Sequence, residues 1–159
     1  MRRILVAIDG LESASRAIEY CGKQFSGMSD LSLTLFHVLP SLPPRFWDDG
    51  RILSKKEKKE RQGVVDKWLE NQKLATEPMF RNAIEILTRA GIPHEQIETK
   101  TICDSVSEVK AILEEARDGD YLTLVLGRRG VSWIDEHLIG STTSRIIHRG
   151  AGLAICVVE

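Results

Sequence analysis

The sequence predicts an α/β protein, a single doubly wound domain in which a five-stranded parallel sheet carries helices on both faces. The length of 159 residues suits one domain. Short apolar runs alternate with segments whose apolar residues recur at helical spacing, an order typical of a parallel sheet. Several of these runs are apolar throughout, as strands buried on both faces are. We therefore expect residues 1–159 to form one domain.

Five apolar runs are the expected strands, in chain order 4–8, 31–38, 97–102, 121–126 and 153–158. Helical patterns lie between them at 17–25, 79–90, 106–116 and 141–149. Gly91 follows the second pattern and is expected to cap that helix. The first and fourth strands are continuously apolar and suit the middle of the sheet, whereas Glu98 and Lys100 place the third at an edge.

The last strand is apolar although it ends the printed sequence, and terminal strands commonly lie at sheet edges. An exposed apolar edge favours aggregation, so we expect another chain to cover it. Our hypothesis is a homodimer that pairs through Leu153 to Val158.

Residues 40–62 interrupt the alternation and form an insertion. Six basic and two acidic residues lie between Arg51 and Arg61. Such a run is typical of the solvated start of a helix, and a patch for nucleic acid or an acidic partner is the alternative. Because Pro78 follows Thr76, the helix after this run is expected to be two helices, the second capped by Thr76.

Composition argues against several classes of partner and compartment. The net charge is -1, so we expect neither nucleic acid nor a membrane surface as a partner. The longest apolar runs span about six residues, against about twenty for a membrane helix. Cys21, Cys103 and Cys156 form no C-x-x-C pair, and we interpret them as buried structural thiols in a reducing cytoplasm.

The most informative motif follows the fourth strand. Gly127-Arg128-Arg129-Gly130 is separated by nine residues from Gly140-Ser141, which opens a helix, with Thr142 and Thr143 next. The start of a helix presents free backbone N–H groups and a partial positive charge, both of which suit phosphate. Glycine lets the backbone approach a ligand, and the hydroxyls and arginines add donors and charge. This pattern predicts a phosphate-binding loop.

Asp9 follows the first strand and is expected to face the same crevice as Gly127, where the strand order reverses. Its carboxylate could hold a ribose hydroxyl or a magnesium ion that bridges phosphates. His37, His94, His137 and His148 show no metal spacing, and His37 is interpreted as structural. No nucleophile–base set stands out, so no catalytic residue is predicted.

The motif, together with Ile4 to Gly10, Phe36-His37-Val38 and the final Ala154 to Val158, resembles the universal stress protein family along nearly the whole chain. In this family, G-x2-G-x9-G-[ST] characterises the members that bind ATP. The resemblance implies that the adenine lies by Ala7 and Val38, the ribose by Leu126 and Gly127, and that Asp9 lies by the ribose and phosphates. It also implies that the phosphates meet a further set: Arg129, Gly130, Gly140, Ser141 and Thr142.

Two departures from the family pattern stand out. Leu11 and Ala14 occupy positions at which the family often has serine, leaving Ser13 or Ser15 to cap the first helix. The family's variable region coincides with residues 40–62, which could form a lid over the adenine or a partner surface.

We therefore predict an ATP-binding regulatory or sensor protein that is dimeric and hydrolyses ATP slowly or not at all. The ligand could also be AMP or another adenine nucleotide, with Mg²⁺ held through the phosphates. Two alternatives stay open at this point. One is a nucleotide-cleaving or adenylating enzyme of related fold, and the other is a stress scaffold whose cleft stays empty.

Overall fold

The computed structural model describes residues 1–10, 12–43, 50–103, 107–128 and 141–159. Within them the chain forms the strands β1 (Arg2–Ala7), β2 (Leu31–Leu39), β3 (Ile97–Cys103), β4 (Thr123–Gly127) and β5 (Ala154–Val158). The helices are α1 (Glu12–Phe25), α2 (Lys55–Arg89), α3 (Glu108–Asp118) and α4 (Ser141–Arg149), with a 3₁₀ turn, η2 (His94–Gln96), before β3. The predicted α/β class and strand–helix order are confirmed.

All neighbouring strands are parallel, in the order β3-β2-β1-β4-β5. The chain builds outward from β1 to β3, then returns to the other side of β1 for β4 and β5. The strand order therefore reverses between β1 and β4, as the sequence predicted. β3 and β5 are the two edges, also as predicted.

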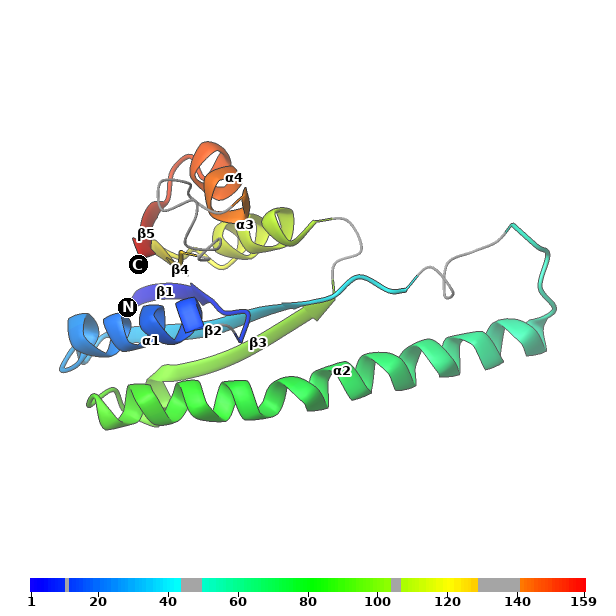
Figure 1. The fold of residues 1–159 in the computed structure, drawn as a ribbon, viewed down its shortest axis with the longest axis horizontal. Helices are drawn as coiled ribbons and strands as arrows, with labels where there is room; N and C mark the ends of the chain where they lie inside the picture. The colour runs from blue at the N-terminus through cyan, green and yellow to red at the C-terminus, as the bar shows by residue number, and fades with distance from the viewer. Residues whose placement is uncertain (11, 44–49, 104–106, 129–140) are drawn as a thin grey trace.

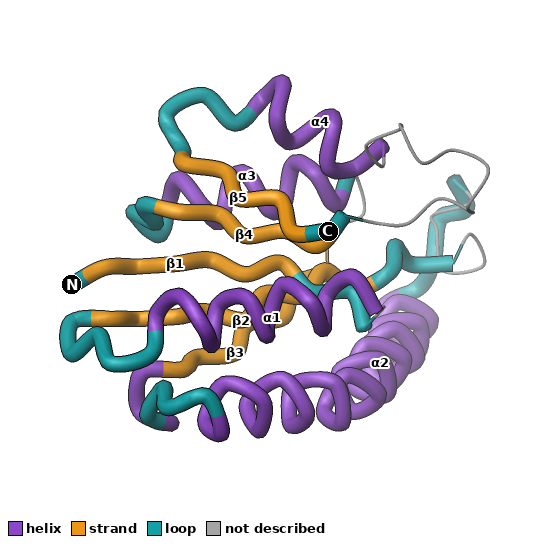
Figure 2. Tube along the Cα trace, turned by 60° about the vertical axis from the view of Figure 1, so that its left-hand side comes forward, coloured by secondary structure: helices purple, strands orange, loops and turns teal. Residues whose placement is uncertain are grey.

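Helices cover both faces of this sheet (Figure 2). α1 and α2 lie on one face, and α3 and α4 lie on the other (Figure 1). The alternation of side chains along β1 explains how both faces acquire a core. Ile4 and Val6 pack with α1 and α2, whereas Leu5 between them packs with α3 and α4. Burial of these apolar residues on both sides drives the assembly of the three layers.

α2 corrects one expectation. It is a single helix of 35 residues with Pro78 inside it, and the hydroxyl of Thr76 donates to the carbonyl of Lys73 instead of capping a new helix. Pro78 has no amide N–H, so it removes one backbone hydrogen bond without ending the helix. The buried residues of α2 begin just after it, at Phe80, and continue with Ala83 and Leu87. The earlier part of α2 projects beyond the tips of β2 and β3 (Figure 1).

Both ends of α2 have recognisable caps. Ser54 and Glu57 form a capping box, in which the hydroxyl of Ser54 accepts from the Glu57 amide at 3.3 Å. At the other end Gly91 adopts a φ of +99°, and the amide of Ile92 donates to the carbonyl of Leu87. A residue with a side chain adopts this left-handed conformation only at a cost, so the predicted role of Gly91 is confirmed.

The three cysteines lie in different environments. Cys21 is buried and Cys156 is half-buried, but Cys103 is exposed at the end of β3. The interpretation of all three as buried thiols is therefore wrong for Cys103, because β3 is an edge strand whose outer face is open. Among the described residues, no helix is both long enough and apolar enough to cross a membrane.

Candidate functional site

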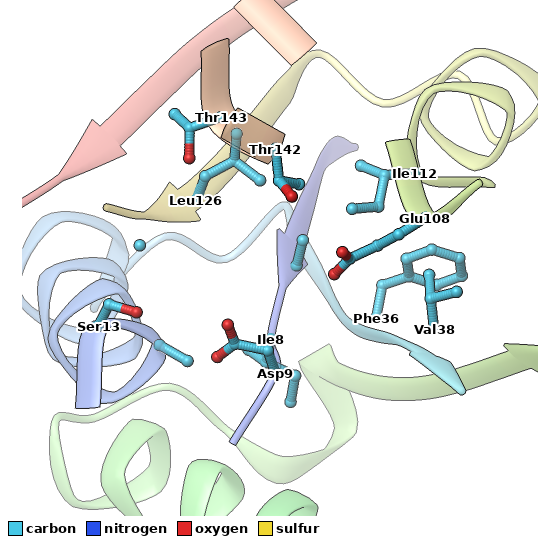
Figure 3. A pocket seen from close by; sticks show the side chains of 13 residues that line it. Ile8, Asp9, Ser13, Phe36, Val38, Glu108, Ile112, Leu126, Thr142 and Thr143 are labelled. Carbon is cyan, nitrogen blue, oxygen red and sulfur yellow. The ribbon is translucent and has the colours of Figure 1, made fainter. Parts of the chain in front are cut away.

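A pocket opens at the carboxyl ends of β1, β2 and β4, at the point where the strand order reverses (Figure 3). Helices from both faces of the sheet complete its wall. Its lining residues are Ala7, Ile8, Asp9, Ser13, Ala14, Phe36, Val38, Glu108, Ile112, Leu126, Gly127, Thr142 and Thr143. Open parallel sheets bind ligands at this place because adjacent loops diverge there and leave a crevice.

One part of the pocket is apolar. Ala7, Val38 and Leu126 come from three adjacent strands, and Ile112 of α3 joins them from the helical layer above. His37, the neighbour of Val38, ties two of these strands together, since its ring Nδ1 lies 2.8 Å from the carbonyl oxygen of Ile8. The structural role predicted for His37 is supported by this contact. A flat apolar group such as a nucleobase suits these walls.

Two carboxylates point into the same pocket (Figure 3). Asp9 follows β1, as the sequence indicated, and Glu108 is the first residue of α3. Both side chains are half-buried. Glu108 was missed in the sequence, although one signal could have found it. It directly precedes the buried stripe of α3, and helices that follow strands of a parallel sheet begin near the ligand-binding edge.

The start of α4 lies at another part of the wall. Ser141 is the first residue of this nine-residue helix and is exposed, whereas Thr142 and Thr143 line the pocket. In Figure 3 both threonine side chains lie at the rim formed with Leu126. Free amides and a partial positive charge at a helix start favour an anionic group here.

Gly127 is required by packing as well as by its place in the motif. A Cβ on this residue would lie 2.2 Å from the carbonyl oxygen of Ser13, because the first turn of α1 passes directly over the end of β4. The same approach brings the hydroxyl of Ser13 to the pocket. Ser13 lies in the second position of α1 and so does not cap the helix, but it supplies a hydroxyl near the family's substituted serine positions.

The structure brings together six of the ten predicted site residues: Ala7, Asp9, Val38, Leu126, Gly127 and Thr142. Ser141 adjoins Thr142 but does not line the pocket. The predicted positions Arg129, Gly130 and Gly140 lie outside the described residues. The guanidinium of Arg128 pairs with the side chain of Glu159 after β5, and Arg128 does not line the pocket. The described residues between 40 and 62 do not line it either.

Comparison with known proteins agrees with this architecture. A universal stress protein solved with cAMP shares 20% identity and a TM-score of 0.63, over 99% of this chain and 96% of that one. One from Archaeoglobus fulgidus, solved with dAMP, shares 17% identity and a TM-score of 0.59, over 100% and 98%. One from Arabidopsis thaliana, with AMP bound, shares 16% identity and a TM-score of 0.60, over 99% and 91%. At these identities the likeness shows the fold.

Curated protein sequences gave no match. The model of the universal stress protein family, however, matches residues 1–151, which is nearly the entire chain. The parallel five-stranded sheet and its strand-end pocket are consistent with that match. The chain belongs to the universal stress protein family.

Proposed function

We propose that this protein binds an adenine nucleotide, ATP first among them, in the pocket at the carboxyl ends of β1 and β4. It would act as a regulatory or sensor protein with little or slow hydrolysis. The observation that carries the proposal is the convergence of six of the ten predicted site residues on one pocket, beside the start of a helix. The relatives solved with cAMP, dAMP and AMP support an adenine nucleotide as the class of ligand.

The pocket suggests an orientation for the nucleotide. The apolar side chains of Ala7 and Val38 suit the adenine, and Leu126 and Gly127 lie where the ribose would follow. The phosphates would then extend toward Thr142. Donors there are expected from the motif residues Arg129, Gly130, Gly140 and Ser141.

Asp9 is the residue that suits a magnesium ion carried in with ATP, since Mg²⁺ prefers carboxylate and phosphate oxygens. Among the described residues, no group of three or more His, Cys, Asp or Glu is arranged to hold a metal. We therefore propose that Mg²⁺ arrives on the phosphates, with Asp9 as its contact from the protein. The ion would neutralise phosphate charge beside the carboxylate.

The alternative of a nucleotide-cleaving enzyme would need a group that activates a water in line with the scissile bond. Asp9 and Glu108 are the carboxylates among the described lining residues, and Asp9 is the one proposed beside the phosphates. Slow turnover that disappears in Asp9→Ala would favour the enzyme reading. Turnover at the level of buffer supports the sensor.

We also propose a cytoplasmic homodimer that forms through β5. This strand is an edge, and Ile155 to Val158 are half-buried in the single chain. Its outward backbone groups are suited to pairing with another strand. The cysteines are free thiols, which suits the reducing cytoplasm.

Isothermal titration with ATP and with AMP tests the proposed ligand class. We expect saturable binding that Gly130→Val weakens at least several-fold while the circular dichroism spectrum stays unchanged, because a side chain would intrude on the phosphates. Arg129→Ala should weaken ATP more than AMP. The matched control is Arg128→Ala, whose guanidinium pairs with Glu159. Unchanged affinity in Gly130→Val would overturn the assignment of the loop, and absence of binding would favour the scaffold.

A further inference from the structure

The described wall of the pocket contains two acidic side chains. Its lining includes the carboxylates of Asp9 and Glu108, and no lysine or arginine is among the described residues that line it. A phosphate placed directly beside the carboxylate of Glu108 would be repelled. A neutral part of the nucleotide therefore suits the space beside Glu108 better than its phosphates do.

Glu108 is held in place by its helix. It begins α3. Val109, the next residue, and Ile112, one turn further along, are buried in the core that α3 shares with β1, β2 and β4. Ile112 lies on the same face as Glu108 and also lines the pocket. The side chain of Glu108 is half-buried, and its carboxylate points into the pocket (Figure 3). A carboxylate on a firmly packed helix is a defined recognition element.

The position of the Glu108 carboxylate indicates which part of a bound nucleotide would contact it. In Figure 3 Glu108 lies between Val38, on the side proposed for adenine, and Thr142, on the side proposed for phosphate. The ribose joins those two parts of a nucleotide. A carboxylate only accepts hydrogen bonds, and the ribose offers two hydroxyl donors. Acidic side chains hold ribose hydroxyls in the same way in dinucleotide-binding folds.

We infer that Glu108 is a specificity-determining residue that accepts a hydrogen bond from a ribose hydroxyl and makes the pocket prefer ribonucleotides to deoxyribonucleotides. The inference rests on the proposed adenine-nucleotide site. It adds to that site a second carboxylate, which belongs to α3 on the face of the sheet opposite α1. The same negative charge keeps phosphates away from the start of α3. It thereby fixes the direction in which the nucleotide enters.

Titration calorimetry with AMP, 2′-deoxy-AMP and 3′-deoxy-AMP tests the inference on the full chain. Wild type should bind AMP roughly ten- to hundred-fold more tightly than at least one deoxy analogue, the range expected for one hydrogen bond to a charged group. In Glu108→Ala this ratio should fall toward one. Glu108→Gln, which keeps an acceptor oxygen, should retain an intermediate ratio.

The matched control is Glu114→Gln. Glu114 is an exposed residue of the same helix that pairs with Lys110 at 3.6 Å, so its substitution removes one negative charge outside the pocket. This variant should keep the wild-type ratio of affinities. Circular dichroism should show the wild-type fold for every variant.

Equal affinity of wild type for AMP and both deoxy analogues, or a ratio that persists in Glu108→Ala, overturns the role of Glu108 and leaves the nucleotide site standing. Equal weakening of all three ligands in Glu108→Ala assigns Glu108 a structural role and also overturns the inference. Failure of wild type to bind any of the three and ATP as well overturns the proposed function itself. If ATP alone binds, ATP and its 2′- and 3′-deoxy forms give the same comparison, with the same outcomes.

Discussion

Gly127 lies where the end of β4 meets the first turn of α1. A methyl group there would come within 2.2 Å of the carbonyl oxygen of Ser13 and 2.9 Å of the amide of Ala14. Backbone atoms of a packed helix can move aside only with a loss of packing and hydrogen-bond energy. The residue therefore links packing of the fold with the shape of the pocket that it lines.

We predict that Gly127→Ala lowers the free energy of unfolding by about 1–3 kcal/mol, the usual cost of overpacking, and weakens nucleotide binding. Urea denaturation followed by circular dichroism measures the first effect. Gly63→Ala is the control, because nothing lies within 4 Å of its added methyl group in the middle of an exposed helical stretch. Stability equal to wild type in Gly127→Ala would show that α1 does not lie this close.

Cys21 gives the fold a dependence on alkaline pH. Burial against the α1–α2 core, and secondarily the neighbouring Cys156, raises its pKa to about 12 from an ordinary value of 9.0. Below pH 9 the thiol is protonated in both the folded and the unfolded chain. Above pH 9 the unfolded chain releases its proton while the folded chain retains it, so stability falls as the pH rises toward 12.

The loss from this one thiol approaches about 1.4 kcal/mol per pH unit well above pH 9. We expect Cys21→Ala, although less stable at pH 7, to lose less stability than wild type between pH 9 and 10.5. Cys103→Ala should follow the wild-type slope, since that thiol is exposed. Parallel curves for wild type and Cys21→Ala would contradict the assignment.

At the scale of elements, the hydrophobic pattern predicted the strands and shorter helices well because burial on one or both faces dictates their period. It failed for α2. Pro78 argued for a break, yet the helix continues through it, because the proline removes only one backbone hydrogen bond of a long helix. A local rule about proline could not anticipate this without knowing what the helix packs against.

The projecting start of α2 should behave as a local unit. Ser54→Ala removes the capping interaction, which is worth about 1 kcal/mol of helix stability. Because the buried residues of α2 lie from Phe80 onward, we expect faster amide exchange near residues 55–61 with little change in global unfolding. Hydrogen exchange read by mass spectrometry measures this, and Ser54→Asp should restore protection.

The same cap should respond to acid. The hydrogen bonds from Ser54 lower the pKa of Glu57, so the cap is complete above the ordinary pKa of glutamate and weakens as the pH falls through the lowered one. Amide exchange near the start of α2 that stays constant with acidification, after correction for intrinsic rates, would contradict this role.

For the whole molecule, the topology made the site predictable. Asp9, Val38 and Gly127 lie at the carboxyl ends of three adjacent strands, so the order of these strands brings them together. Glu108 and Ser13 were not predicted to line the pocket, because they reach it from helices. The rotation of a helix about its axis depends on packing, and sequence periodicity does not determine it to within one residue. The pairing of Arg128 with Glu159 depends on the register of β4 and β5 and was likewise beyond the sequence pattern.

The proposed dimer also belongs to this scale. We predict that sedimentation at micromolar concentration shows a dimer for wild type and a monomer for Val157→Lys, because a lysine on an edge strand opposes strand pairing. Lys23→Ala, on the exposed end of α1, should remain dimeric. A monomeric wild type would contradict pairing through β5.

We propose above all that an adenine nucleotide occupies the pocket at the reversal of strand order. Titration of ATP into isotopically labelled protein, followed by the backbone amide resonances, tests it most directly. We predict saturable shifts concentrated at the ends of β1, β2 and β4 and at the starts of α3 and α4, with the projecting part of α2 unchanged. Shifts confined to α2, or no shifts at millimolar ATP, would contradict it.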